Sequence, residues 1–224
     1  MIADVEVVRS PRARRARLSV DPASGRVRLT IPGRAAVSRY AEWLESHRGW
    51  IATQQAKLPR PRPFAPGAAI PFGDDTLTLD WAEANPRTVR RVDGRLVCGG
   101  PAEGLARRVD AWLRREARRV LTEETAHYAA RAGVTVVAVT IGDPRARWGS
   151  CTSTGRIRYS WRLILAPEHV RRSTVAHEVA HRVHMNHSPA FHAAADAIFE
   201  GSHAEARAWL RKHGAALHWI GRDY

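Results

Sequence analysis

The sequence predicts an α+β fold, and three observations support that class. Residues 5–31 and 69–98 contain short runs in which apolar and polar residues alternate, a pattern typical of strands. From about residue 103 to 131, apolar side chains recur at the spacing of one helix face. Strand-like runs between residues 134 and 165 then lead into further helical segments. We therefore expect a β-rich N-terminal region followed by a mixed region of strands and helices.

One long helix is expected inside the N-terminal region, because the apolar period becomes helical over residues 35–58. The proline-rich segment 59–67 cannot continue that helix and should form a stiff, extended connector. Short strands are expected after it, and the sequence GlyGlyPro at 99–101 ends this part of the chain. We accordingly divide the protein into residues 1–101 and residues 102–224.

The C-terminal region begins with the long helix and continues with strands. A β-rich run covers residues 134–141, and two further strands are expected at 145–153 and 156–165, around a glycine turn. The second of these leads directly into another helix. Residues 202–205 have the spacing of a capping box, so a last helix is expected from there to about His213.

The composition is strongly basic. The 224 residues include 36 Lys and Arg against 22 Asp and Glu, which gives a net charge of +14. A charge of this size attracts polyanions through its long-range field. The basic residues are scattered along the chain rather than gathered in one tail, which favours a solvated basic surface. Nucleic acid is the second interpretation of the charge and stays open as a partner.

The cysteines and the apolar runs bear on location. Cys98 and Cys151 are the only cysteines and lack C-x-x-C spacing, which suits a reducing compartment rather than a disulfide framework. The N-terminus has no apolar core of signal-peptide length. The longest strongly apolar run, residues 134–141, is far too short to span a bilayer. We expect a cytoplasmic protein with no membrane partner, and the sequence predicts no oligomeric state.

The segment from Val175 to His187 contains the pattern H-E-x-x-H at His177, Glu178 and His181. Residues four apart lie on one face of a helix, so the two motif histidines can present imidazole nitrogens to one metal ion. The glutamate lies about 100° further round the helix than the first histidine, where a base for a metal-bound water belongs. A catalytic zinc keeps three protein ligands, so a third ligand must come from beyond this helix.

His187 is the simplest third ligand, because its spacing from the motif is that of the metzincin signature H-E-x-x-H-x-x-G-x-x-H. The rest of that signature is absent. His184 stands at the glycine position, and no methionine follows Met185 to form a Met-turn. In a thermolysin-like arrangement the third ligand would instead be a glutamate from a following helix, here Glu200 or Glu205.

Four stretches of the C-terminal region resemble the YgjP-like metallopeptidase family, a group of small bacterial zincins related in their core to SprT-like proteases. They are TrpGlySerCys at 148–151, TrpArgLeuIleLeuAlaPro at 161–167, HisGluValAlaHis at 177–181 and AsnHisSer-x-x-Phe at 186–191. The resemblance extends over most of the chain, and this C-terminal block of motifs is its specific part.

The resemblance implies a zincin-like catalytic core, in which a small sheet, the H-E-x-x-H helix and C-terminal helices surround one zinc ion. It also implies a zinc metallopeptidase that acts on peptide or protein substrates, with Glu178 activating zinc-bound water. The zinc ligands that it carries over are His177, His181 and His187.

Two positions depart from the family pattern. Ser160 stands where asparagine is common, and His192 stands where tryptophan is common. Neither belongs to the ligand set, but both bear on the substrate side of the site. The group that stabilises the oxyanion is open, and the candidates are His184, His192, Tyr159 and Arg147.

Other functions are open from the sequence. The family is also described as a metal-dependent hydrolase with nucleoside-triphosphate pyrophosphatase activity on UTP, although no glycine-rich phosphate loop is visible. The net charge of +14 keeps a DNA-associated, SprT-like protease open. A structural zinc module that binds a partner would need a fourth ligand, and His184 or Cys151 could serve.

Overall fold

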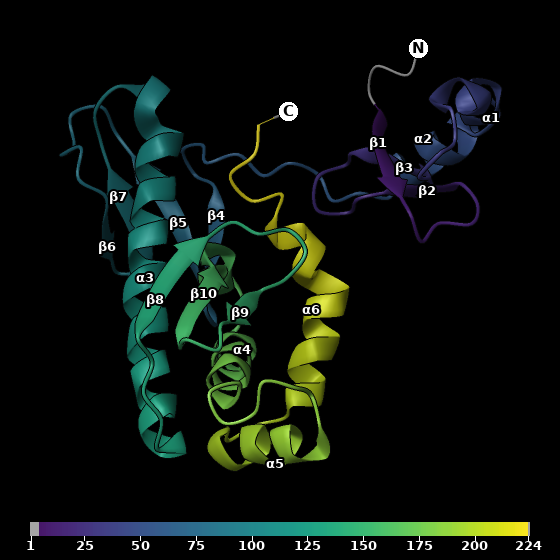
Figure 1. The fold of residues 1–224 in the computed structure, drawn as a ribbon. Helices are drawn as coiled ribbons and strands as arrows, with labels where there is room; N and C mark the ends of the chain where they lie inside the picture. The colour runs from purple at the N-terminus through teal and green to yellow at the C-terminus, as the bar shows by residue number, and fades with distance from the viewer. Residues whose placement is uncertain (1–4, 224) are drawn as a thin grey trace. The chain divides into compact units, whose positions relative to one another are not determined.

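The computed structural model describes residues 5–223 (Figure 1). This part of the chain is an α+β protein with three small sheets, as the sequence predicts. Contacts divide the chain into two compact units, one ending at Arg60 and one beginning at Pro61, and each has its own hydrophobic core. Among the described residues, no helix is both long and apolar enough to cross a membrane.

The N-terminal unit is built on a three-stranded sheet in the order β1-β3-β2. Its strands are β1 (Val5–Ser10), β2 (Arg17–Val20) and β3 (Val27–Pro32). The central strand, β3, is parallel to β1 and antiparallel to β2. Its alternate residues Leu29 and Ile31 are fully buried and pack with Leu44 from the following helices. The β structure predicted over residues 5–31 is therefore confirmed.

The single helix expected over residues 35–58 is wrong. The segment instead forms a 3-10 turn and two short helices, which are Val37–Tyr40, α1 (Ala41–Ser46) and α2 (Arg48–Ala56). The His47 ring donates from Nδ1 to the carbonyl of Trp43 at 2.7 Å, while the His47 backbone N–H bonds to Leu44 at 3.1 Å. Because the ring takes the carbonyl that the backbone N–H would use in an α-helix, the first helix ends at this residue.

The second unit begins with a four-stranded sheet in the order β4-β5-β7-β6. Its strands are β4 (Ala69–Phe72), β5 (Asp75–Trp81), β6 (Arg90–Val92) and β7 (Arg95–Cys98), followed by a 3-10 turn at Ala102–Gly104. Apolar residues of this sheet, among them Leu77 and Leu96, share one core with the long helix α3 (Leu105–Ala132). Residues 61–101 thus pack with the C-terminal half, and a domain 1–101 that folds separately stays a prediction.

A second sheet of this unit packs on the helix that carries the motif, in the order β8-β10-β9, so β9 is an edge strand. Its strands are β8 (Ala138–Gly142), β9 (Gly149–Cys151) and β10 (Arg156–Ser160). The middle strand is parallel to β8 and antiparallel to β9. The first strand begins later than expected, because the N–H of Val134 still bonds to the carbonyl of Ala129 at the end of α3.

The strand expected over residues 156–165 is too long, since β10 ends at Ser160. The Ser160 hydroxyl accepts a hydrogen bond from the backbone N–H of Arg162 at 3.3 Å and caps a 3-10 turn. That turn, Trp161–Leu165, is buried throughout. An apolar run without a turn residue predicts a strand, but here the serine side chain redirects the backbone.

The second unit continues with three helices, which are α4 (Glu168–Ala180), α5 (Pro189–Ile198) and α6 (His203–Leu217). The H-E-x-x-H motif begins in the last turn of α4. The motif helix α4 packs against both α3 and α6, and α5 lies across their ends (Figure 1). The side chain of Ser202 caps α6, as predicted. This helix runs past its expected end at His213. Gly214 does not end the helix but allows close packing, since a Cβ there would lie 2.8 Å from Trp148 Cζ2.

A buried ion pair joins α3 to the motif helix. Arg171 donates from Nη2 to Glu124 Oε1 at 2.8 Å and from Nε to the same oxygen at 3.0 Å. The two side chains are 5% and 15% exposed, respectively. Burial raises the pKa of Glu124, and the guanidinium of Arg171 opposes that shift. The pair fixes α4 against α3 upstream of the motif.

Candidate metal centre

Three histidines meet at the C-terminal end of α4. His177 lies in the last turn of the helix, His181 follows at its C-cap, and His187 comes from the loop beyond. One ligand atom from each lies within 4.8 Å of the other two, and the Nε2 atoms of His177 and His187 are 3.1 Å apart. The structure thus brings together the three ligands that the sequence predicts.

The loop between His181 and His187 is folded by its own hydrogen bonds. The His181 ring donates from Nδ1 to the backbone carbonyl of His184 at 3.1 Å. This bond leaves Nε2 unprotonated, which is the form that binds a metal. Asn186 Oδ1 accepts from the N–H of Ser188 at 3.2 Å, and Ser188 then caps α5. Among the described residues of this loop none has a positive φ, so it turns without the glycine of the metzincin signature.

An apolar floor supports the three imidazole rings. Phe191 is fully buried, and its ring centroid lies 4.9, 4.5 and 4.8 Å from those of His177, His181 and His187. Burial lowers the pKa of His177 to about 3, with His181 and His187 as the next causes. Burial also lowers the pKa of His181. Neutral imidazoles are therefore favoured at His177 and His181, as metal binding requires.

Glu178 is buried beside this triad and is only 6% exposed. Strand β9 passes directly against it: a Cβ on Gly149 would lie 2.5 Å from Glu178 Oε1, so a larger residue would displace the carboxylate. Burial raises the pKa of Glu178 to about 7, while Arg147 lowers it. A carboxyl group with this pKa can both accept and return a proton near neutral pH, although a bound cation would shift the pKa downward.

A cavity of about 450 Å³ opens in front of these groups. One wall is α4 with the histidines and Glu178, the second is α6, and the third is the segment that contains β9. Apolar side chains also contribute, namely Trp148, Met185, Ala206 and Leu210. A cavity of this size and mixed lining is typical of a ligand site.

The four candidate oxyanion groups lie in different places. Arg147 lines the cavity. The backbone carbonyl of His184 accepts the hydrogen bond from the His181 ring, and His192 is exposed on α5. Neither residue is among the described residues that line the cavity. Tyr159 is fully buried, its hydroxyl lies 3.1 Å from that of Thr125, and burial raises its pKa. Of the four, we carry only Arg147 forward to the substrate side of the site.

The alternative ligands are placed elsewhere. Glu200 accepts hydrogen bonds from the Tyr128 hydroxyl at 3.0 Å and from Arg172 at 3.1 Å. Glu205 lies in the first turn of α6, and Cys151 lines the cavity. Within residues 5–223, only the three histidines form a cluster of ligand atoms. The geometry thus favours three protein ligands with one open position.

Sequence reasoning missed several polar neighbours of the triad. Ser173, one turn before His177, donates to His203 Nδ1 at 2.7 Å, and His203 Nε2 donates to the carbonyl of Ala195 at 3.3 Å. Arg207, one turn after His203, lines the same cavity. None of these residues belongs to a motif. Helix spacing could have indicated only that residues 203 and 207 share a face of α6.

A histidine triad lies beside a buried glutamate, at the end of a helix that packs on a small sheet, as the H-E-x-x-H pattern predicts. The family model "YgjP-like, metallopeptidase domain" matches residues 14–213, and the chain belongs to this family. It is therefore a metal-dependent peptidase in general class, which implies a metal ion and a peptide or protein substrate. The three imidazoles, whose ligand atoms lie within 4.8 Å of one another, fit such an ion.

Comparison of structures finds the crystal structure of the metallopeptidase zymogen of Pyrococcus abyssi abylysin. The TM-score is 0.37 and the identity 18%, with 41% of this chain and 93% of that chain covered. A likeness at this TM-score carries no weight, and family membership is shown by the family model. No curated protein matches the chain at a significant level.

Proposed function

We propose that the protein is a zinc-dependent peptidase in which His177, His181 and His187 hold the ion and Glu178 is the catalytic base. One observation supports this most strongly. The three imidazoles meet within 4.8 Å in the wall of a cavity that the buried Glu178 also lines. Three histidines with no fourth protein ligand in the described chain suit a catalytic zinc, which keeps one position open.

Zinc in this site would supply a Lewis acid that polarises the scissile carbonyl and brings the pKa of a water molecule towards neutrality. Glu178 would accept the proton of the attacking water and return it to the leaving amine. The close approach of Gly149 leaves no room for a larger residue between β9 and this carboxylate, and burial of the carboxylate raises its pKa. Both features suit a group that transfers one proton in each direction.

Strand β9 offers an extended peptide a place beside Glu178. It is the edge of its sheet, and its three residues, Gly149–Cys151, all line the cavity. A peptide that added to this edge as a further strand would gain main-chain hydrogen bonds and present its carbonyl groups to the cavity. We therefore favour peptides that bind in an extended conformation.

The test replaces Glu178 with glutamine. Glu178→Gln keeps the size of the side chain but cannot accept a proton, so it should retain zinc and lose turnover by at least about 100-fold. Cleavage of casein by the zinc-loaded full chain is measured, with the metal content of the same sample. Full activity in this variant would contradict the role of Glu178. Wild-type protein that releases pyrophosphate from UTP and leaves casein intact would identify a nucleotide hydrolase instead.

A further inference from the structure

Two arginines line the cavity in addition to the metal-binding groups and the base. Arg147 lies two residues before β9, and Arg207 lies on α6. Among the described residues that line this cavity, Glu178 is the only acidic one. The cavity therefore presents two guanidinium groups against one carboxylate, before any metal ion adds its charge.

Arg207 faces the cavity because of its position on the helix. The residues of α6 that line the cavity follow one another at the spacing i, i+3, i+4 and i+7, and they are His203, Ala206, Arg207 and Leu210. The hydrogen bond of His203 with Ser173 fixes this face of α6 against α4.

Arg147 approaches from the wall that contains β9. The next residue, Trp148, is held in place: its ring centroid lies 5.2 Å from that of His218, and its ring packs against Gly214 of α6. Arg147 therefore lines the cavity from the β9 side, and Arg207 lines it from the α6 side.

Neither arginine belongs to one of the ion pairs of the described chain. Within the part of the chain that the structure describes, no salt bridge or side-chain hydrogen bond joins Arg147 or Arg207 to another residue. Arg162 and Arg171, by contrast, are buried in ion pairs with Asp143 and Glu124. An exposed arginine without a partner is ordinary on a basic surface. Two of them on one cavity, beside a metal site, indicate that the cavity receives an anionic group.

We propose that Arg147 and Arg207 bind a carboxylate of the substrate next to the bond that is cut, so that the substrate class is peptides with a carboxylate at that position. This inference rests on the proposed peptidase function. A planar guanidinium binds a carboxylate through paired, charge-assisted hydrogen bonds. The carboxylate is that of an Asp or Glu side chain or that of the peptide C-terminus. The apolar side chains of Trp148 and Leu210 suit an apolar residue beside it.

The first experiment uses the zinc-loaded full chain and a tryptic digest of whole-cell protein as a mixture of peptides. Mass spectrometry of the new chain ends gives the residues around every bond that is cut. The proposal expects Asp and Glu to be enriched at one position beside the bond, or cuts to fall at a fixed short distance from the C-terminus. The first pattern identifies a side-chain carboxylate, and the second identifies the terminal one.

Pairs of quenched fluorescent peptides then give the size of the preference. Each pair differs only in Glu against Gln at the enriched position, or in a free against an amidated C-terminus. The wild-type kcat/KM should be about tenfold higher for the carboxylate form. This ratio should fall towards one in Arg147→Gln and in Arg207→Gln, and Arg207→Glu should turn the preference towards Lys. Arg145→Gln and Arg211→Gln make the same charge change outside the cavity and should keep the wild-type ratio.

The two proposals fail in different ways. Equal kcat/KM for the two members of every pair, or a wild-type ratio in both cavity variants, would overturn the recognition of a carboxylate and leave the peptidase intact. A digest in which no peptide is cut, under conditions where zinc is bound, would overturn the peptidase function and this inference with it. A ratio that falls in the cavity variants and not in their matched controls supports the inference.

Discussion

In the proposed site, His187 is the third zinc ligand, and without it the motif helix would present only two histidines. The motif helix supplies only His177 and His181, which are not enough to hold a catalytic zinc. His187 is presented by a loop whose turn depends on the hydrogen bond from Ser188 to Asn186. Its Nε2 lies 3.1 Å from that of His177, close enough for both to bind one ion.

Replacement of His187 should therefore remove the metal. We expect His187→Ala to lower the affinity for zinc by more than about 100-fold, because loss of a ligand costs more than loss of its supporting partner. Zinc affinity is measured by competition with a chromophoric chelator. His192→Ala is the matched control, since His192 is exposed nearby and does not line the cavity, and it should bind zinc like the wild type. Undiminished zinc binding by His187→Ala would place the third ligand elsewhere.

At this scale, the sequence predicts the ligand set and the base because their roles depend on spacing within one short segment. Gly149 approaches Glu178 closely, and Arg207 lines the same cavity as the motif. Both features bring together segments that are distant in the chain, so no local pattern predicts them. Tyr159 shows the opposite case. Its chemistry suits an oxyanion donor, but only the fold reveals that it is fully buried.

At the scale of elements, the motif helix depends on its neighbours for its position. The ion pair between Arg171 and Glu124 ties it to α3, and the contact of Ser173 with His203 ties it to α6. Both contacts precede the metal ligands along α4. His177 and His181 therefore project from a helix that is fixed on two sides, which orients them before any ion binds.

The ion pair gives a prediction for stability. Arg171→Met should lower the free energy of unfolding by about 3–5 kcal/mol, because it leaves the Glu124 carboxylate buried without a cation. The loss should shrink at acid pH, where that carboxyl group becomes protonated, since burial already raises its pKa. Urea unfolding followed by tryptophan fluorescence measures both effects.

Two variants control this prediction. The double variant Glu124→Leu with Arg171→Met should recover much of the stability, because no unpaired charge remains. Arg48→Met breaks an exposed ion pair with Glu45 and should cost less than about 1 kcal/mol. An Arg171→Met loss as small as that of Arg48→Met would show that the buried pair does not fix α4.

The existence and type of most elements follow from periodicity, but their ends do not. The helix expected over residues 35–58 is interrupted because the His47 ring takes a backbone carbonyl. The strand expected over 156–165 ends early because Ser160 caps a turn. In both cases one polar side chain competes with the regular backbone hydrogen bonds, and a hydrophobic pattern does not reveal that competition.

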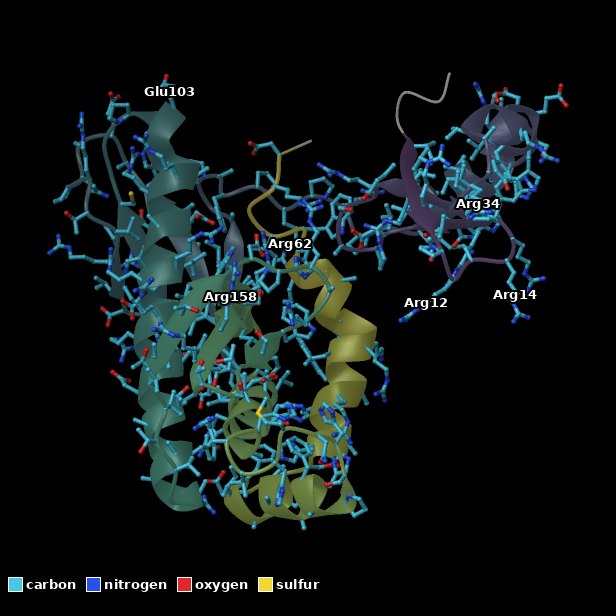
Figure 2. All side chains as sticks on the ribbon, in the orientation of Figure 1. Arg12, Arg14, Arg34, Arg62, Glu103 and Arg158 are labelled. Carbon is cyan, nitrogen blue, oxygen red and sulfur yellow. The ribbon has the colours of Figure 1, made fainter. Side chains whose placement is uncertain are left out.

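At the scale of the whole molecule, charge is the main property outside the site. The net charge of +14 comes from arginines spread along the chain. In Figure 2, Arg12 and Arg14 extend outward from the N-terminal unit. Such groups contribute to a general attraction for polyanions, which does not by itself specify a nucleic-acid function.

This charge predicts salt-dependent binding to single-stranded DNA. The affinity should fall at least about tenfold between about 50 and 200 mM salt, because counterions screen exposed charges and compete for phosphates. Fluorescence anisotropy of a labelled oligonucleotide measures it. A salt-independent affinity would contradict a binding mode based on charge alone. Only cleavage stimulated by DNA would support a DNA-associated protease.

The three-histidine site is tested most directly by a crystal structure of the zinc-loaded full chain, with anomalous scattering recorded at the zinc edge. We predict one ion bonded to Nε2 of His177, His181 and His187 at about 2.0–2.1 Å, with its fourth position open to the cavity. The Glu178 carboxylate should lie beside the ion without bonding to it. An ion closed by a fourth protein ligand such as Cys151, or bound away from these histidines, would contradict the proposed catalytic site.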